Sequence, residues 1–172
     1  MEKVIQVLNG MQADRVVEKY AIGGGIAALY YLEPYLTDDI DVFVSPVIIG
    51  QAGIVSLEPI YSYLQKLGYL AVREGVMIDE WLVQFIPTFS PLQEEAISQS
   101  LNVSYGVTNT YIFSPEHLAA ELLRSGRLKD QVRVIALIEG GRVDMSKFRA
   151  IVERHGLADA WTQFAAQFNL EA

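Results

Sequence analysis

The sequence predicts an α/β (α+β) fold in which residues 1–113 mix strands with helices and residues 114–172 form a helical subdomain packed on them. In the first part, short apolar runs bounded by Gly, Pro and Asp alternate with segments of helical periodicity, which is typical of a sheet flanked by helices. After Ser114 only helical periodicity remains, interrupted by glycines that suit helix ends. With 172 residues, the chain is near the usual size of one domain with a small appendage.

Composition and charge exclude several classes of protein. Hydrophobic residues make up 51% of the chain and charged residues 20%, which supports a sizeable core and argues against disorder. The chain has no cysteine, and no apolar run reaches the ~18–20 residues that span a bilayer, so we expect a cytoplasmic protein without a membrane partner. The formal net charge of −8 disfavours a large nucleic-acid footprint, because that affinity depends on Lys and Arg. It is compatible with binding one nucleotide through a metal ion.

The elements of the first part follow from periodicity and turn residues. Helical spacing covers about Glu2–Lys19, although Gly10 weakens it. The segment Ser45–Ser56 contains one proline and two glycines and is expected to be an irregular loop. The other elements expected here are a strand from Tyr20, a helix over Leu57–Leu67, strands over Tyr69–Glu74, Val76–Ile78 and Trp81–Ile86, a helix over Pro91–Leu101 and a strand over Tyr111–Phe113.

The helices of the second part carry their own boundary signals. Ser114 and Pro115 match an N-cap followed by proline at the first helical position, and Asp144 can cap a later helix. His117 and His155 are the only histidines, and we expect structural roles for both, near a helix start and a helix end. The four helices expected are Ser114–Ser125, Lys129–Glu139, Asp144–Arg154 and Leu157–Phe168.

The most informative stretch is Tyr20–Val44. A short apolar run leads into three consecutive glycines, and a helical segment of small and apolar residues follows. The stretch ends with Asp39 and Asp41 at the start of a second apolar run. Residues two apart in a strand point to the same face, with ~3.3 Å of rise per residue. Asp39 and Asp41 would therefore project side by side, with their Cα atoms ~6–7 Å apart.

This arrangement has a chemical use. Two adjacent carboxylates can share divalent cations, and Mg²⁺ or Mn²⁺ prefers hard oxygen ligands. Glycines let backbone N–H groups approach an anion at a helix N-terminus, where the dipole also favours negative charge. The stretch thus suggests a nucleoside triphosphate (NTP) held between the glycine turn and a metal on Asp39 and Asp41. The alternatives are a solvated strand edge for the two acids and tight packing for the glycines.

The spacing from the glycines to Asp39 and Asp41 resembles the signature of the nucleotidyltransferase superfamily typified by DNA polymerase β. More closely, it looks like small bacterial nucleotidyltransferases of the abortive-infection toxin type (AbiEii-like). Three later segments also resemble that group: WLVQFIP at 81–87, SPEHLAAELLRSGRLKD at 114–130 and RHGL at 154–157. The resemblance therefore covers most of the chain, from about Tyr20 to Leu157.

This resemblance implies a small mixed sheet flanked by helices, with a helical C-terminal part. It also implies transfer of a nucleoside monophosphate from an NTP to an acceptor hydroxyl or phosphate. Asp39 and Asp41 would coordinate Mg²⁺ and act in catalysis. The nucleotide-binding residues that it implies are Gly23, Gly24, Gly25, Thr37, Arg127, Lys129 and Asp130.

Two positions depart from the pattern of the group. The superfamily's third catalytic carboxylate, which acts in activating the acceptor, matches Gln84 here. A neutral amide cannot take a proton or bind Mg²⁺ as a carboxylate does. Many relatives also carry a lysine in the helix before the GRLKD segment, and this chain has none there, which leaves Arg124, Arg127 or Lys129 to supply positive charge to the phosphates.

The leading hypothesis is a Mg²⁺-dependent nucleotidyltransferase whose acceptor, a tRNA, a protein or a small molecule, stays open. This hypothesis includes a role as the toxin of a toxin–antitoxin or phage-defence system, with an antitoxin protein as partner. The alternative is a catalytically impaired member that serves as a nucleotide- or protein-binding module, which Gln84 favours. A purely structural domain would leave the alternating acids Asp39 and Asp41 unexplained.

Overall fold

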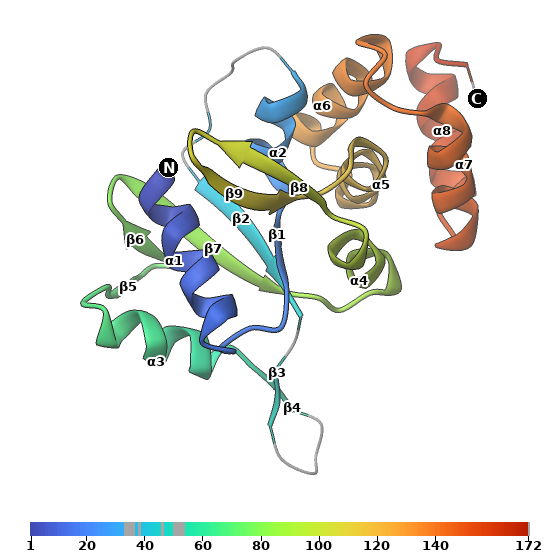
Figure 1. The fold of residues 1–172 in the computed structure, drawn as a ribbon. Coiled ribbons are helices and arrows are strands. Elements are labelled where there is room, and N and C mark those ends of the chain that lie inside the picture. The colour runs from blue at the N-terminus through green and yellow to red at the C-terminus, as the bar shows by residue number, and fades with distance from the viewer. Residues whose placement is uncertain (33–36, 38, 46, 50–53, 172) are drawn as a thin grey trace.

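A seven-stranded mixed sheet lies between two groups of helices (Figure 1). The computed structural model describes residues 1–32, 37, 39–45, 47–49 and 54–171. The sheet has the strand order β5-β6-β7-β2-β1-β9-β8, and β3 and β4 form a separate hairpin. The strands are β1 (Tyr20–Ile22), β2 (Asp39–Val44), β3 (Val47–Ile49), β4 (Ile54–Ser56), β5 (Ala71–Val72), β6 (Gly75–Ile78), β7 (Trp81–Pro87), β8 (Leu101–Tyr105) and β9 (Thr108–Ile112).

The helices divide between the two faces of the sheet. They are α1 (Glu2–Ala13), α2 (Gly24–Tyr31), α3 (Glu58–Lys66), α4 (Pro91–Ser98), α5 (Pro115–Ser125), α6 (Leu128–Glu139), α7 (Met145–Arg154) and α8 (Ala158–Phe168). Helices α1 and α3 lie on one side of the sheet, and α2 and α4 to α8 lie on the other (Figure 1). Within the described residues, none of these helices has the length and apolar character that crossing a membrane requires.

Strand alternation separates two hydrophobic cores. Tyr20 and Ile22 of β1 are fully buried in the core with α1 and α3. Ala21, between them, faces the other core, which contains Phe43 of β2 and the apolar residues of the C-terminal helices. Because residues two apart share a face, Asp39 and Asp41 lie on the same face of β2 as Phe43. The two acids are therefore on the side of α2 and the C-terminal helices.

Strand pairing decides which residues surround this pair of acids. Strand β1 is antiparallel to β2, so the end of β1 lies beside the start of β2. Strand β7 is parallel to β2, and its Gln84 is the register partner of Asp41. The position assigned to Gln84 from the sequence is thus directly beside Asp41 in the sheet.

Several elements differ from the sequence-based expectations. Helix α1 ends at Ala13 instead of near Lys19, and Gly10 lies inside it without breaking it. The expected loop over Ser45–Ser56 contains the β3–β4 hairpin, so that expectation was wrong. Strand β8 was not predicted at all, because the preceding helix was extended over its start. It is an exposed edge strand, so burial imposes no alternation that a pattern search could detect.

The predicted boundaries of the C-terminal helices are confirmed by their caps. Ser114 accepts a hydrogen bond from the backbone N–H of His117 at 3.3 Å, as an N-cap residue does. Asp144 accepts hydrogen bonds from the backbone N–H groups of Ser146 and Lys147 at 3.0 and 3.2 Å. These signals are local in sequence, which explains why they could be interpreted without the tertiary structure.

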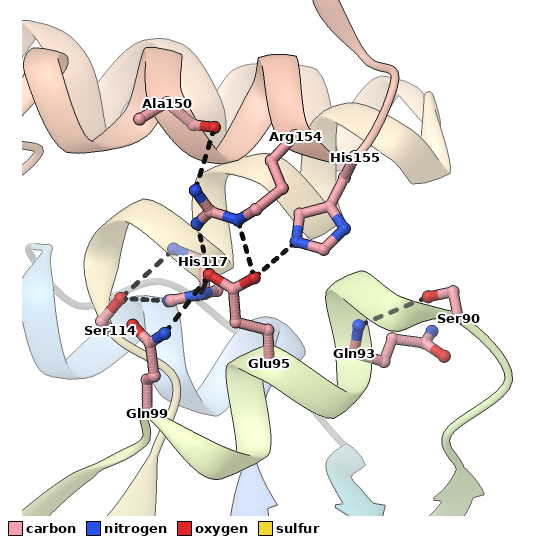
Figure 2. Close-up of polar contacts among 9 residues, drawn as sticks. All are labelled: Ser90, Gln93, Glu95, Gln99, Ser114, His117, Ala150, Arg154 and His155. Atoms are coloured by element: carbon pink, nitrogen blue, oxygen red, sulfur yellow. Dashed lines mark hydrogen bonds and ion pairs between the residues drawn. The ribbon is translucent and has the colours of Figure 1, made fainter.

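A carboxylate on α4 joins three helices through charged hydrogen bonds (Figure 2). Glu95 accepts hydrogen bonds from Arg154 at 2.5 and 3.0 Å. His155, at the C-terminal end of α7, lies 2.8 Å from Glu95, and His117 of α5 lies 3.3 Å from it. The hydrogen bonds from Arg154, then those from the two histidines, lower the pKa of Glu95 to about 2. Both histidines therefore have a structural partner that the sequence did not indicate.

We expect Glu95→Gln to lower the free energy of unfolding by about 2 kcal/mol at pH 7, the scale of hydrogen bonds to a charged group. Because the pKa of Glu95 is lower in the folded protein, its stabilisation is present above the ordinary value of 4.5 and is lost as the pH falls towards about 2. Urea denaturation at pH 7 and pH 3 measures both effects. The neighbouring exposed Glu94→Gln is the control, and an equal loss in both variants would contradict the prediction.

Candidate active site

Asp41 lies against the N-terminus of α2. The backbone N–H of Gly23, the N-cap residue, donates a hydrogen bond to the carbonyl oxygen of Asp41 at 2.9 Å. A Cβ atom at Gly24 would collide with the Asp41 carboxylate, so this carboxylate occupies the space that a side chain would need. The glycine turn is therefore in direct contact with Asp41, the second acid of β2.

The three glycines also serve packing. A Cβ at Gly23 would lie 2.5 Å from the ring of Phe43, and one at Gly25 would lie 2.6 Å from Oγ1 of Thr37. Gly24 has φ +53°, a conformation that favours glycine. All three glycines are buried, so the close packing expected for them is observed at the N-terminus of α2.

We expect Gly24→Ala to reduce both stability and nucleotide binding. The new methyl group must displace the Asp41 carboxylate, and alanine at positive φ adds strain of about 1 kcal/mol. The free energy of unfolding should fall by about 2 kcal/mol or more in urea denaturation. Gly106→Ala is a matched control, since that glycine also has a positive φ but open space around its Cβ position. Similar losses of nucleotide binding in both variants would contradict a site at Gly24.

Positive charge reaches the acids from the start of α6. Burial, then the charge of Asp39, raises the pKa of Asp41, while the charges of Arg127, Lys129 and Arg133 act in the opposite direction. A Cβ at Gly25 would lie 3.1 Å from Nη2 of Arg133, so this guanidinium lies beside the N-terminus of α2. One carboxylate and three cationic side chains thus act electrostatically on Asp41.

Asp130 holds the two arginines in place. Its side chain is fully buried and accepts hydrogen bonds from Nε of Arg127 at 2.7 Å and from Nη1 of Arg133 at 2.9 Å. The Ser125 hydroxyl also donates to it. Burial raises the pKa of Asp130, but the hydrogen bonds from Ser125 and Arg127 and the charges of both arginines outweigh it and leave the pKa below its ordinary value. This geometry suits a residue that orients the cations.

Two further predicted residues have defined partners. The Thr37 hydroxyl donates to Oδ1 of Asp39 at 3.2 Å, so it fixes that carboxylate. Arg124, one of the candidate cations, instead pairs with Glu121 at 2.7 Å. The other expected residues near the phosphates, Arg127 and Lys129, act on Asp41 as described above.

Sequence reasoning missed two residues of this region. Arg133 follows Asp130 by three residues, and that spacing on a helix could have indicated the pair. Glu74, in the turn between β5 and β6, accepts a hydrogen bond from Nε2 of Gln84 at 3.3 Å. No local signal could have indicated Glu74, because its approach depends on how β6 pairs with β7.

The donor set at Asp39 and Asp41 fits a hard divalent cation. The charge of Asp39 adds to burial in raising the pKa of Asp41, so a cation bound by Asp41 would offset this repulsion, and Mg²⁺ in nucleotide sites commonly uses one or two carboxylates plus substrate phosphates. Over the part of the chain that the structure describes, Asp, Glu and His side chains form no group of three that could hold a metal by themselves. Phosphate oxygens would therefore complete the coordination.

Comparison with solved structures defines the class of fold. The crystal structure of an antigenic nucleotidyltransferase-like protein from Paracoccidioides brasiliensis is 16% identical, with a TM-score of 0.54, and the match covers 80% of this chain and 76% of that chain. The solution structure of the antibiotic-resistance factor ANT(2'')-Ia is also 16% identical, with a TM-score of 0.52, covering 96% of this chain and 93% of that chain. The chain therefore has a nucleotidyltransferase-like fold, which confirms the predicted mixed sheet with a helical C-terminal part.

A crystal structure of ANT(2'')-Ia in complex with adenylyl-2''-tobramycin matches less well, with a TM-score of 0.47 at 16% identity over 95% of this chain and 94% of that chain. No protein-family model matches the sequence, and no curated protein does.

Proposed function

We propose that this protein is a nucleotidyltransferase that moves a nucleoside monophosphate from an NTP to an acceptor. The observation that carries this proposal is the position of Asp41, which lies against the N-terminus of α2 and whose pKa is raised by burial but lowered by the charges of Arg127, Lys129 and Arg133. Carboxylates for a metal ion, a helix N-terminus and cations are the groups that bind and neutralise a triphosphate. The nucleotidyltransferase-like fold supports the same conclusion.

Each residue has a physical role in this proposal. Asp39 and Asp41 hold Mg²⁺ or Mn²⁺, and Thr37 keeps the Asp39 carboxylate oriented. When bound, the metal ion neutralises charge that develops on the phosphates. The backbone at Gly23, Gly24 and Gly25 approaches the triphosphate, and the cations of α6 bind its outer phosphates. Asp130 is given a positioning role, because all its described contacts are to Ser125, Arg127 and Arg133.

The finer assignments rest on the sequence resemblance. We propose that the chain is AbiEii-like, that it acts in the cytoplasm and that residues 1–113 form the catalytic core with residues 114–172 as a helical subdomain. The acceptor classes to be compared are tRNA, protein and small molecules. A role as the toxin of a toxin–antitoxin pair, with an antitoxin protein as partner, belongs to the same proposal.

A second candidate is a nucleotide- or protein-binding module without turnover. Gln84 favours it, because the register partner of Asp41 carries an amide where a carboxylate could accept a proton. The paired acids and the cations would then bind an NTP without transferring it. Binding and transfer must be measured separately to distinguish the two.

The test uses each of the four NTPs labelled at the α-phosphate, with Mg²⁺ or Mn²⁺, and acceptors from tRNA, protein and small-molecule fractions of a cell extract. Wild-type protein should bind an NTP only with metal and should transfer label to one fraction, and Asp39→Asn should do neither. Metal-dependent binding without transfer to any fraction would support the binding module instead. Absence of metal-dependent NTP binding in the wild type would overturn both functions.

A further inference from the structure

Transfer to a hydroxyl acceptor requires a proton acceptor near the attacking oxygen. A general base must lie within hydrogen-bonding reach of that proton, directly or through one water. Asp39 and Asp41 are assigned to the metal, and the amide of Gln84 cannot take a proton. Among the residues that the proposed function assigns to metal binding or to the position of Gln84, none is available to accept the proton of the acceptor hydroxyl.

Glu74 supplies a carboxylate that contacts the side chain of Gln84. Gln84 is the register partner of Asp41 on the neighbouring strand, and its Nε2 donates a hydrogen bond to Oε1 of Glu74 at 3.3 Å. Adjacent strands are ~4.8 Å apart, so the backbone of Gln84 lies one strand spacing from that of Asp41, and Glu74 lies one hydrogen bond beyond the Gln84 side chain. Glu74 is exposed, which leaves its carboxylate accessible to an acceptor that arrives from solvent.

The fold explains how a turn residue reaches this position. Glu74 lies in the tight turn between β5 and β6, where Arg73 has φ +52°. Gly75 follows, and a Cβ there would lie 2.6 Å from the carbonyl oxygen of Val83. The absence of a side chain at Gly75 lets the turn approach β7 beside Gln84. A larger residue at this glycine would move Glu74 away from the site.

We propose that Glu74 is the general base of the transfer reaction, with Gln84 as the residue that positions it; this inference rests on the proposed function. The acceptor O–H gives its proton to the Glu74 carboxylate while its oxygen forms a bond to the α-phosphorus. The bond from that phosphorus to the bridging oxygen of the β-phosphate breaks, and pyrophosphate leaves with the electron pair. Atoms and charge balance without any further reactant.

A role as a third metal ligand fits the geometry less well. The described Asp, Glu and His residues include no group of three that could hold a metal, so Glu74 is not within a shared coordination sphere with Asp39 and Asp41. A hydrogen bond from an amide keeps a carboxylate in place without adding charge. In this proposal Gln84 is not the base itself but holds the base, Glu74, by a hydrogen bond. The Glu74 carboxylate comes from the turn between β5 and β6.

The test compares Glu74→Gln with wild type in two assays, equilibrium binding of each NTP with Mn²⁺ and release of pyrophosphate. Pyrophosphate is measured with the acceptor fraction that takes the label and also with water as the acceptor. We expect Glu74→Gln to bind the NTP within about twofold of wild type and to release pyrophosphate about 10²-fold more slowly, the lower end for loss of a general base. Glu153→Gln, which makes the same change at an exposed site on α7, should match wild type in both assays.

Rescue distinguishes a base from a structural residue. The double variant Glu74→Gln with Gln84→Glu should regain at least tenfold of the lost rate, because it returns a carboxylate to the register position of Asp41. If wild type releases pyrophosphate and Glu74→Gln releases it at the same rate, the role of Glu74 is overturned and the proposed function is left intact. A slow Glu74→Gln variant that Gln84→Glu does not rescue would also overturn it. Wild-type protein that binds NTP but releases no pyrophosphate with any acceptor would overturn transfer and base together.

Discussion

We expect Asp41→Asn to abolish metal-dependent NTP binding while making the fold more stable. Burial and the charge of Asp39 raise the pKa of Asp41, so the ionised carboxylate is unfavourable in the folded protein when no cation is bound. A neutral amide removes that cost, and the free energy of unfolding should rise by about 0.5–2 kcal/mol, as is common when a strained functional group is replaced. Any nucleotidyl transfer should fall on the order of 10³-fold, because the metal supplies several kcal/mol to the transition state.

The pH dependence of this effect has a definite sign. Because the pKa of Asp41 is higher in the folded protein than its ordinary value of 3.8, wild type is relatively more stable when Asp41 is protonated and loses that advantage as the pH rises through the raised pKa. The stability gain of Asp41→Asn should therefore be larger at pH 8 than at pH 4. Thermal unfolding with and without Mg²⁺ and NTP measures both properties, since a ligand that binds only the native state raises its melting temperature.

The exposed Asp159→Asn is the control for a change of one carboxylate to an amide. A variant at Asp41 that is less stable than wild type at pH 8, or that keeps a metal-dependent shift in melting temperature, would contradict a metal site at this residue.

We expect Asp130→Ala to lower the free energy of unfolding by about 3 kcal/mol, the largest stability loss among the changes considered. Asp130 is fully buried, and its removal leaves the nearly buried Arg133 guanidinium, whose side chain is 12% exposed, without its carboxylate partner. The pKa of Asp130 is lowered, so its stabilisation is present at neutral pH and is lost as the pH falls below the ordinary range for aspartate. The loss caused by Asp130→Ala should thus shrink at pH 3.

This substitution also tests the positioning role. Without Asp130, Arg127 and Arg133 each lose the hydrogen bond that orients them, and affinity for an NTP should fall at least tenfold in the fraction that remains folded. Urea denaturation and NTP titration give the two values, and Asp159→Ala is the exposed control. An NTP affinity equal to that of wild type would show that the arginines do not bind the phosphates.

The sequence indicated the candidate site because the patterns that suggest it involve residues close together in the chain. Three glycines before a helix and two acids that alternate at the start of a strand are patterns of neighbouring residues, and their chemistry is evident before folding. The caps Ser114 and Asp144 belong to the same kind of signal. By contrast, β8 was missed because an exposed edge strand has no buried face to impose a pattern, and the end of α1 was misjudged because apolar residues continue beyond Ala13.

The sequence by itself determined the pair Asp39 and Asp41, the glycine turn and the order of helices after residue 113, since each depends on residues a few positions apart. Only the tertiary structure decided which distant groups meet them. Arg133 reaches the N-terminus of α2 because α6 packs beside it, and Glu74 reaches Gln84 because β6 pairs with β7 in one register. The distances in both contacts follow from how whole elements pack and pair, which no local pattern records.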